Sequence, residues 1–116
     1  MANQFFNVEF LEEARRFLKL LDKKAAAKIM ANIRKSQSCI DPALFKKLTI
    51  DIWEFRTSYQ GIQYRMLAFW DKTDKSHTLV IATHGFLKKQ SKVPDTEIMR
   101  AQNLRNSYFK DKNSNS

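Results

Sequence analysis

Basic side chains recur between residues 46 and 92, and four of them, Arg56, Arg65, Lys88 and Lys89, could perform phosphate chemistry. An arginine fork binds two phosphate oxygens and stays charged, and a lysine crowded by other cations can exchange protons. Cleavage of RNA by its own 2′-hydroxyl needs a base, a cation on the pentavalent phosphate and an acid for the leaving 5′-oxygen. These side chains could supply that chemistry without a metal ion.

Further residues complete the candidate site. Glu54 and His84 are candidate bases, and Lys46, Lys47, Lys92 and Trp53 are candidate contacts to RNA. Aromatic side chains stack on bases in RNA sites, so Trp53, Phe69 and Trp70 could do so. Their periodicity favours core packing instead, above all for Trp53.

A structural interpretation of the same residues stays open. Arg56 and Arg65 could simply pair with Glu54 and Asp51 on a solvated sheet face, and the residues alone favour this, because structural ion pairs are common. A histidine at the end of a strand, such as His84, is also more often structural than catalytic.

The overall charge indicates the class of partner. The chain has 21 Lys and Arg against 12 Asp and Glu, a formal net charge of +9. A basic field of this kind favours a polyanionic partner such as RNA.

Several function classes lack their motifs. The sequence has no nucleotide-binding glycine loop, zincin motif or nucleophile elbow, and the single Cys39 with two histidines is too little for a zinc site. We therefore expect neither a metal nor a cofactor. The start of the chain lacks the features of a signal peptide, and no apolar run approaches membrane-spanning length, so a cytoplasmic location without membrane contact is expected.

Hydrophobic periodicity predicts the elements that position these residues. Residues 6–10 alternate as a short strand, and residues 36–48 form a connector. Residues 12–21 and 22–35 between them have helical spacing, either as two helices with Asp22 as the cap of the second or as one bent helix. Strands follow over 52–57, 62–70 and 78–83, the last apolar enough to be covered on both faces. A helix begins near Pro94. The prediction is one α+β domain over 1–110 with an antiparallel sheet, followed by a disordered polar tail over 111–116.

This arrangement would bring the cations together. In the predicted hairpin, Arg56 and Arg65 point to the same face, where we expect them to be exposed. Lys88 and Lys89 leave the end of the next strand, so they would lie at the rim of that face.

An ordered set of residues, spread over nearly the whole chain, closely resembles the RelE/ParE toxin family and in particular its HigB-like, phage-derived branch. The set is Phe10-Leu11, Lys28-Ile29, Phe45-Lys46-Lys47-Leu48, Ile52-Trp53-Glu54-Phe55-Arg56, Tyr64-Arg65, Leu79-Val80-Ile81, His84-Gly85-Phe86-Leu87-Lys88-Lys89, Pro94, Glu97-Ile98 and Ala101.

The resemblance implies a fold, an activity and partners. The fold is an antiparallel sheet with an N-terminal helical hairpin. The activity is that of an endoribonuclease, an mRNA interferase that cuts mRNA on the translating ribosome. The partners are the mRNA, the ribosome and a cognate antitoxin, often a helix-turn-helix protein, in a toxin–antitoxin oligomer.

Individual positions match the family unevenly. Arg65 falls where RelE-type toxins carry a phosphate-binding arginine, Lys88 or Lys89 falls near their basic residue after the last strand, and Arg56 lies in the strand of their lysines. Glu54 replaces one of those lysines and could serve as a base. The tyrosine that these toxins carry after the last strand has no clear match, because Tyr108 comes too late.

Two other functions stay open. One is a ParE-like poison of DNA gyrase, which cuts nothing itself, although Arg65 and the Lys88–Lys89 pair argue against it. The other is an inactive family member that acts only as an antitoxin-binding co-repressor, an alternative that Glu54 and the missing tyrosine keep open.

Overall fold

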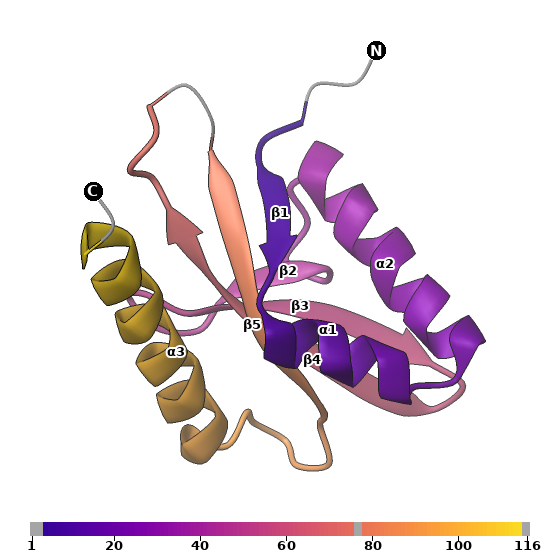
Figure 1. Cartoon of the computed structure of the whole chain (residues 1–116). Coiled ribbons are helices and arrows are strands. Elements are labelled where there is room, and N and C mark those ends of the chain that lie inside the picture. The colour runs from indigo at the N-terminus through magenta and orange to yellow at the C-terminus, as the bar shows by residue number, and fades with distance from the viewer. Residues whose placement is uncertain (1–3, 76–77, 115–116) are drawn as a thin grey trace.

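The computed structural model describes residues 4–75 and 78–114, and it places a sheet between helices (Figure 1). The elements in chain order are β1 (Asn7–Phe10), α1 (Glu12–Leu20), α2 (Lys23–Ser38), β2 (Phe45–Lys47), β3 (Trp53–Tyr59), β4 (Ile62–Asp71), β5 (Leu79–Leu87) and α3 (Asp95–Ser114). The strands form one five-stranded sheet in the order β1-β5-β4-β3-β2. The predicted α+β class is confirmed.

Two apolar clusters hold the helices on opposite faces of the sheet. Met66, Ala68 and Val80 pack with residues of α1 and α2, whereas neighbouring positions such as Leu67 and Phe69 pack with residues of α3. Successive side chains of a strand point to opposite faces, so the central strands must be apolar at nearly every position. The prediction of a strand covered on both faces is confirmed for β5, which lies between β1 and β4.

The sheet is mixed, not antiparallel throughout as expected. β3, β4 and β5 form the predicted antiparallel meander, but β1 pairs in parallel with β5 through the register Val8↔Val80. Short turns require antiparallel pairing only for strands that directly follow one another, and five other strands and helices lie between β1 and β5 in the chain.

The predicted connector over residues 36–48 contains an unexpected short strand. β2 pairs with β3 through Phe45↔Phe55 and Lys47↔Trp53. The aromatic rings of Phe45 and Phe55 stack at 4.4 Å between centroids, a cross-strand contact that stabilises the pairing. Three residues are too few to show strand periodicity in the sequence.

The N-terminal helical stretch forms two separate helices, and the prediction of Asp22 as the cap of the second is confirmed. The Asp22 carboxylate accepts hydrogen bonds from the backbone N–H groups of Lys24 and Ala25 at 3.1 and 3.4 Å, as a helix N-cap does. β1 comes before this pair. The helical hairpin is therefore not the N-terminal element that the resemblance implied.

Helix α3 extends further than predicted, because its last turns are held by the sheet. It continues through Ser114, whereas residues 115–116 of the expected tail lie outside the described residues. The buried carboxylate of Asp71 on β4 accepts hydrogen bonds from the Tyr108 hydroxyl at 2.6 Å and the Lys112 ammonium at 2.7 Å. This contact fixes the helix over a stretch whose polar composition suggested disorder.

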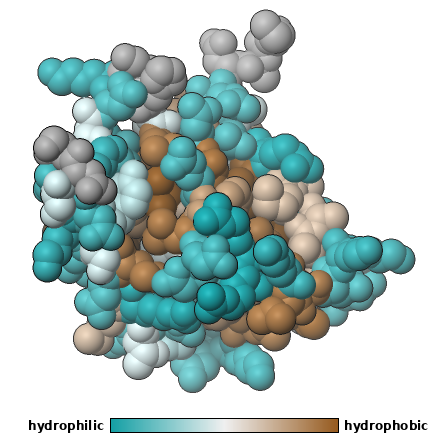
Figure 2. Space-filling model, in the orientation of Figure 1, coloured by the Kyte–Doolittle hydropathy of each residue, from teal (hydrophilic) through white to brown (hydrophobic). Residues whose placement is uncertain are grey.

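The face of the molecule in Figure 2 has hydrophobic patches between hydrophilic residues. Cys39 is exposed and carries a free thiol. No helix among the described residues is both long and apolar enough to cross a membrane.

Candidate functional site

The β3–β4 hairpin determines which side chains meet at the site. Its two-residue loop consists of Gln60 and Gly61, with φ values of 50° and 78°. Two successive positive φ values are typical of the type I′ turn that favours tight hairpins. The resulting register places Arg56 directly opposite Arg65, so the prediction that both lie on one face is confirmed.

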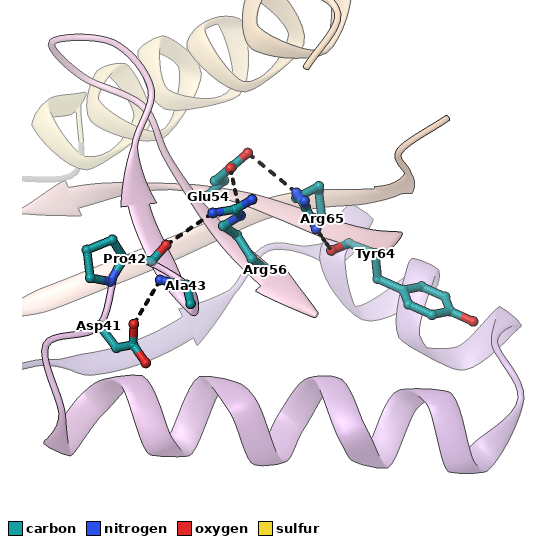
Figure 3. Close-up of polar contacts among 7 residues, drawn as sticks. All are labelled: Asp41, Pro42, Ala43, Glu54, Arg56, Tyr64 and Arg65. Atoms are coloured by element: carbon teal, nitrogen blue, oxygen red, sulfur yellow. Dashed lines mark hydrogen bonds and ion pairs between the residues drawn. The ribbon is translucent and has the colours of Figure 1, made fainter. Parts of the chain in front are cut away.

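Both arginines approach the carboxylate of Glu54 (Figure 3). Arg56 Nε lies 3.4 Å from Glu54 Oε1, and Arg65 Nε lies 3.8 Å from Glu54 Oε2. The side chains of Arg65 and Glu54 are 3% and 4% exposed, and that of Arg56 is 31% exposed. The expectation that Arg65 is exposed is therefore wrong, because the side chain is almost fully buried in the sheet.

Backbone carbonyls hold the two guanidinium groups in place. Arg65 Nη1 donates to the Tyr64 carbonyl at 2.9 Å, and Arg56 Nη1 donates to the Pro42 carbonyl at 3.3 Å. The Asp41 carboxylate accepts a hydrogen bond from the Ala43 N–H at 2.9 Å, which fixes the turn that presents the Pro42 carbonyl. Side chains held in this way lose little further freedom when they bind an anion.

The cluster of Arg56, Glu54 and Arg65 contains polar atoms without a hydrogen-bond partner among the described residues. Glu54 Oε2, Arg56 Nε and Arg65 Nε are buried and lack a hydrogen-bond partner among the described residues. Two guanidinium groups also face a single carboxylate, which leaves one positive charge in excess. Buried polar groups are normally hydrogen-bonded, so these atoms indicate a site that an anionic group would complete.

Burial and neighbouring charges change the pKa of Arg65, the more buried of the two arginines. Loss of solvent lowers the pKa of Arg65, the Glu54 carboxylate raises it, and the Arg56 charge lowers it again. A guanidinium keeps its proton even so, because its pKa is far above neutrality. Arg65 is therefore a fixed, partly desolvated positive charge, and such charges interact strongly with anions.

The comparison with protein families identifies the chain. Residues 16–106 match the model of the phage-derived Gp49-like proteins. The chain belongs to this family. Among curated proteins, no sequence matches this Gp49-like chain.

A solved structure has the same fold as this Gp49-like protein. It is a chain of the toxin–antitoxin complex RelBE2 from Mycobacterium tuberculosis, with a TM-score of 0.54 and 22% sequence identity over 72% of this chain and 98% of that chain. At this identity, the likeness shows the fold alone.

The candidate lysines of the Gp49-like protein lie in two places, on the edge strand β2 and after the end of β5. Lys46 is paired directly with Glu54 and so shares the face of the arginines, whereas Lys47 is paired with Trp53 and faces the other way. The Lys88 N–H donates to the Gln63 carbonyl at 2.7 Å, which continues the β4–β5 pairing beside the site. Lys89 and Lys92 are exposed on the loop that follows.

His84 shares this face but is enclosed. Its Nε2 lies 3.0 Å from the Glu97 carboxylate of α3, its Nδ1 lies 3.0 Å from the Thr83 hydroxyl, and the residue is 1% exposed. Burial lowers the pKa of His84, while the hydrogen bond to Glu97 raises it. Both ring nitrogens are thus occupied at the sheet–α3 interface, and the structure does not bring His84 to an open surface.

The aromatic candidates pack away from the arginine cluster. Trp53 stacks on Phe45 at 4.9 Å between centroids and meets Trp70 edge to face at 5.6 Å. Phe69 is fully buried under α3. Asp51, a possible partner of the two arginines, lies 3.6 Å from Arg105 instead.

One aromatic residue beside the cluster is not evident from the sequence. Phe86 is half-buried and lies opposite Arg65 across β4 and β5. The signal that could have located it is the strand register. A bulge between Leu67 and Ala68 shifts that register, so Phe86 could not be placed without the structure.

This arrangement can bind a phosphodiester and accept a proton from a hydroxyl group beside it. Arg65 and Arg56 offer fixed positive charge, and Glu54 offers an acceptor oxygen between them. Among the described residues, no group of three or more His, Cys, Asp or Glu side chains could hold a metal ion.

Proposed function

We propose that this Gp49-like protein is the HigB-like toxin of a type II toxin–antitoxin pair and a metal-independent, ribosome-dependent mRNA endonuclease. The observation that carries the proposal is the Arg56–Glu54–Arg65 cluster, with its excess positive charge and its buried atoms that have no hydrogen-bond partner among the described residues. The fold shared with a chain of a toxin–antitoxin complex supports it.

The cluster's geometry supports the following reaction. The scissile phosphate binds to the guanidinium of Arg65, with Arg56 as a second cation. Glu54 accepts the proton of the 2′-hydroxyl, whose oxygen attacks the phosphorus, and the P–O5′ bond breaks. Lys88 or Lys89 delivers a proton to the leaving 5′-oxygen. The products are a 2′,3′-cyclic phosphate and a 5′-hydroxyl.

The remaining cations bind the rest of the strand. Lys46 shares the face of Glu54, and Lys92 extends the charge along the loop after β5. The ribosome orients the mRNA for in-line attack, which accounts for a requirement for translation. The cognate antitoxin, of the helix-turn-helix type, neutralises the toxin in a complex, and the toxin acts in the cytoplasm.

The test is a map of RNA ends after brief induction of the protein in cells. We expect growth arrest and new 5′-hydroxyl ends within translated regions, with far fewer cuts when purified protein acts on naked RNA. Intact messages together with trapped DNA gyrase would contradict the proposal in favour of a gyrase poison.

A further inference from the structure

A second surface lies on the opposite side of the sheet from the arginine cluster. It is a groove beyond the last turn of α2, lined by Phe5, Cys39, Ile40, Phe45, Trp53 and Trp70 among others. We call it the aromatic groove. It draws on four separate stretches of the chain, which the hydrogen bond from the Phe5 N–H to the Gln37 carbonyl at 2.7 Å helps to hold together.

The aromatic groove is exposed to solvent although its lining is apolar. Phe5 is 50% exposed and Ile40 is 81% exposed, and α2 ends at Ser38, short of this region. The indole Nε1 of Trp70 is buried and has no hydrogen-bond partner among the described residues. Contiguous exposed apolar surface of this kind marks interaction sites, and the Trp70 N–H is a donor that an occupant could satisfy.

The free edge of the sheet lies next to the groove. β2 is the last strand of the sheet, and the Arg56 N–H donates to the Leu44 carbonyl at 2.8 Å. In an antiparallel ladder, every second residue exchanges hydrogen bonds with its partner strand. The backbone N–H and C=O of Lys47 therefore point away from β3, as an added strand requires.

Charge indicates what kind of strand fits. Lys47 lies opposite Trp53 on the groove side of the sheet, and Lys72 Nζ lies 5.4 Å from the centroid of the Trp70 ring. The whole chain carries a formal net charge of +9. Lys47 and Lys72 therefore offer an acidic segment complementary charge beside the apolar floor. Asp41 also lines the groove, but its carboxylate already accepts a hydrogen bond from the Ala43 N–H.

We propose that the aromatic groove and the edge of β2 together bind an extended, acidic segment of a partner protein, with alternate apolar side chains in the groove. The inference rests on the proposed function, since the partner meant is the antitoxin, and it adds where and in what conformation that partner binds. A second copy of the chain fits poorly, because its own positive charge would oppose Lys47 and Lys72. RNA fits poorly too, because the rings of Phe45, Trp53 and Trp70 pack on one another.

The chain carries its own reporters of binding at this surface. Its two tryptophans and its single cysteine all line the groove. Tryptophan emission and the rate of Cys39 alkylation by a maleimide therefore both report on occupancy. The probe is a capped synthetic peptide of about eight residues, the length of an ordinary strand, with alternating Leu and Glu. Peptides with Lys in place of Glu, or Ser in place of Leu, are its controls.

We expect saturable binding of the Leu/Glu peptide, with a shift in tryptophan emission, slower alkylation of Cys39 and slower hydrogen exchange at the Lys47 amide. Ile40→Asp should weaken binding about tenfold or more, the effect of one buried apolar contact. Leu20→Asp is the matched control, since Leu20 is also 81% exposed but is the last residue of α1, next to the start of α2 and not to its end at Ser38. It should bind as the unmodified protein does.

Other outcomes overturn the inference. These are no binding of the Leu/Glu peptide, equal binding of the Leu/Lys peptide, or equal losses in Ile40→Asp and Leu20→Asp. RNA cleavage in cells is measured separately for Ile40→Asp, and it should be unchanged. If the peptide does not bind but the protein still cuts mRNA, the result contradicts this inference and leaves the proposed function intact.

Discussion

The Nε atom of Arg65 lies 3.8 Å from Oε2 of Glu54, and both side chains are almost fully buried. Neither atom has a hydrogen-bond partner among the described residues. A buried ion pair that is imperfectly bonded contributes little to stability. The pair is better explained by a function in which an anion approaches Arg65 and a proton moves to Glu54.

Replacing Arg65 should therefore abolish most activity. Arg65→Ala removes the fixed phosphate ligand, and we expect cleavage to fall roughly 10²- to 10³-fold, as for the loss of one preorganised oxyanion donor. Arg65→Lys should restore little, because an ammonium group lacks the bidentate fork. The measurement is the frequency of cuts in cells, with growth arrest as a second readout.

Because Arg65 is buried, this substitution should also reduce stability. Arg65→Ala removes one of the two ion-pair partners of the buried Glu54 carboxylate and leaves only Arg56. We expect this loss to lower the unfolding free energy by about 1–3 kcal/mol. Thermal melting is the control that separates this effect from the loss of activity. A folded Arg65→Ala protein that remains fully toxic would remove Arg65 from the mechanism.

Glu54→Gln tests the proposed base with little change of shape. The amide cannot take the 2′-hydroxyl proton, so we expect cleavage to fall about 10²- to 10⁴-fold, the usual contribution of a general base. Binding of an uncleavable 2′-deoxy message to the toxin–ribosome complex should persist, because both arginines remain. If Glu54 only positions the arginines, binding and cleavage will instead decline together.

Lys88→Ala and Lys89→Ala test which of the two lysines delivers the proton. Each should lower the cut frequency less than Arg65→Ala, because the neighbouring cation can replace the missing one. The double variant should lose far more activity than either single variant. Equal activity of the double variant and the unmodified protein would exclude both lysines from the reaction.

The sequence predicted those features that depend on local patterns. Asp22 as a helix cap follows from its residue type and position, the central strand over 79–82 follows from a continuous apolar run, and the shared face of Arg56 and Arg65 follows from the two-residue repeat of strands. Such patterns can be read without knowledge of the tertiary structure.

Features that depend on distant contacts could not be predicted in this way. The parallel pairing of β1, the end of α3 and the burial of Arg65 arise from segments far apart in the chain. Lys46 and Lys47 show the limit clearly, because adjacent strand residues must face opposite sides and only the pairing with Glu54 decides which one joins the site.

Gly85 should tolerate no side chain, because Phe17 of α1 packs directly on it. A Cβ at position 85 would overlap ring atoms of Phe17, including Cγ at 2.6 Å. We expect Gly85→Ala to lower the unfolding free energy by about 1–3 kcal/mol, the usual cost of overpacking. Urea denaturation measures the change. Phe17→Leu in the same chain should recover part of the loss, and the absence of any recovery would contradict the steric explanation.

Asp71 should hold α3 on the sheet, and its contribution should depend on pH. Burial alone would raise its pKa, but hydrogen bonds from Lys112, Thr73 and Tyr108 outweigh burial and hold the pKa below its usual range. A depressed carboxylate pKa stabilises the fold above the unfolded value of about 3.9 and loses that effect as the pH falls below it. Asp71→Asn should therefore lower the unfolding free energy by about 3 kcal/mol at neutral pH. The difference in unfolding free energy from the unmodified protein should narrow between about pH 5 and pH 2.

Lys112→Ala should lower the unfolding free energy less than Asp71→Asn, since the Lys112 side chain is 43% exposed. Denaturant melts across this pH range test the prediction, which a gap that is constant with pH would contradict.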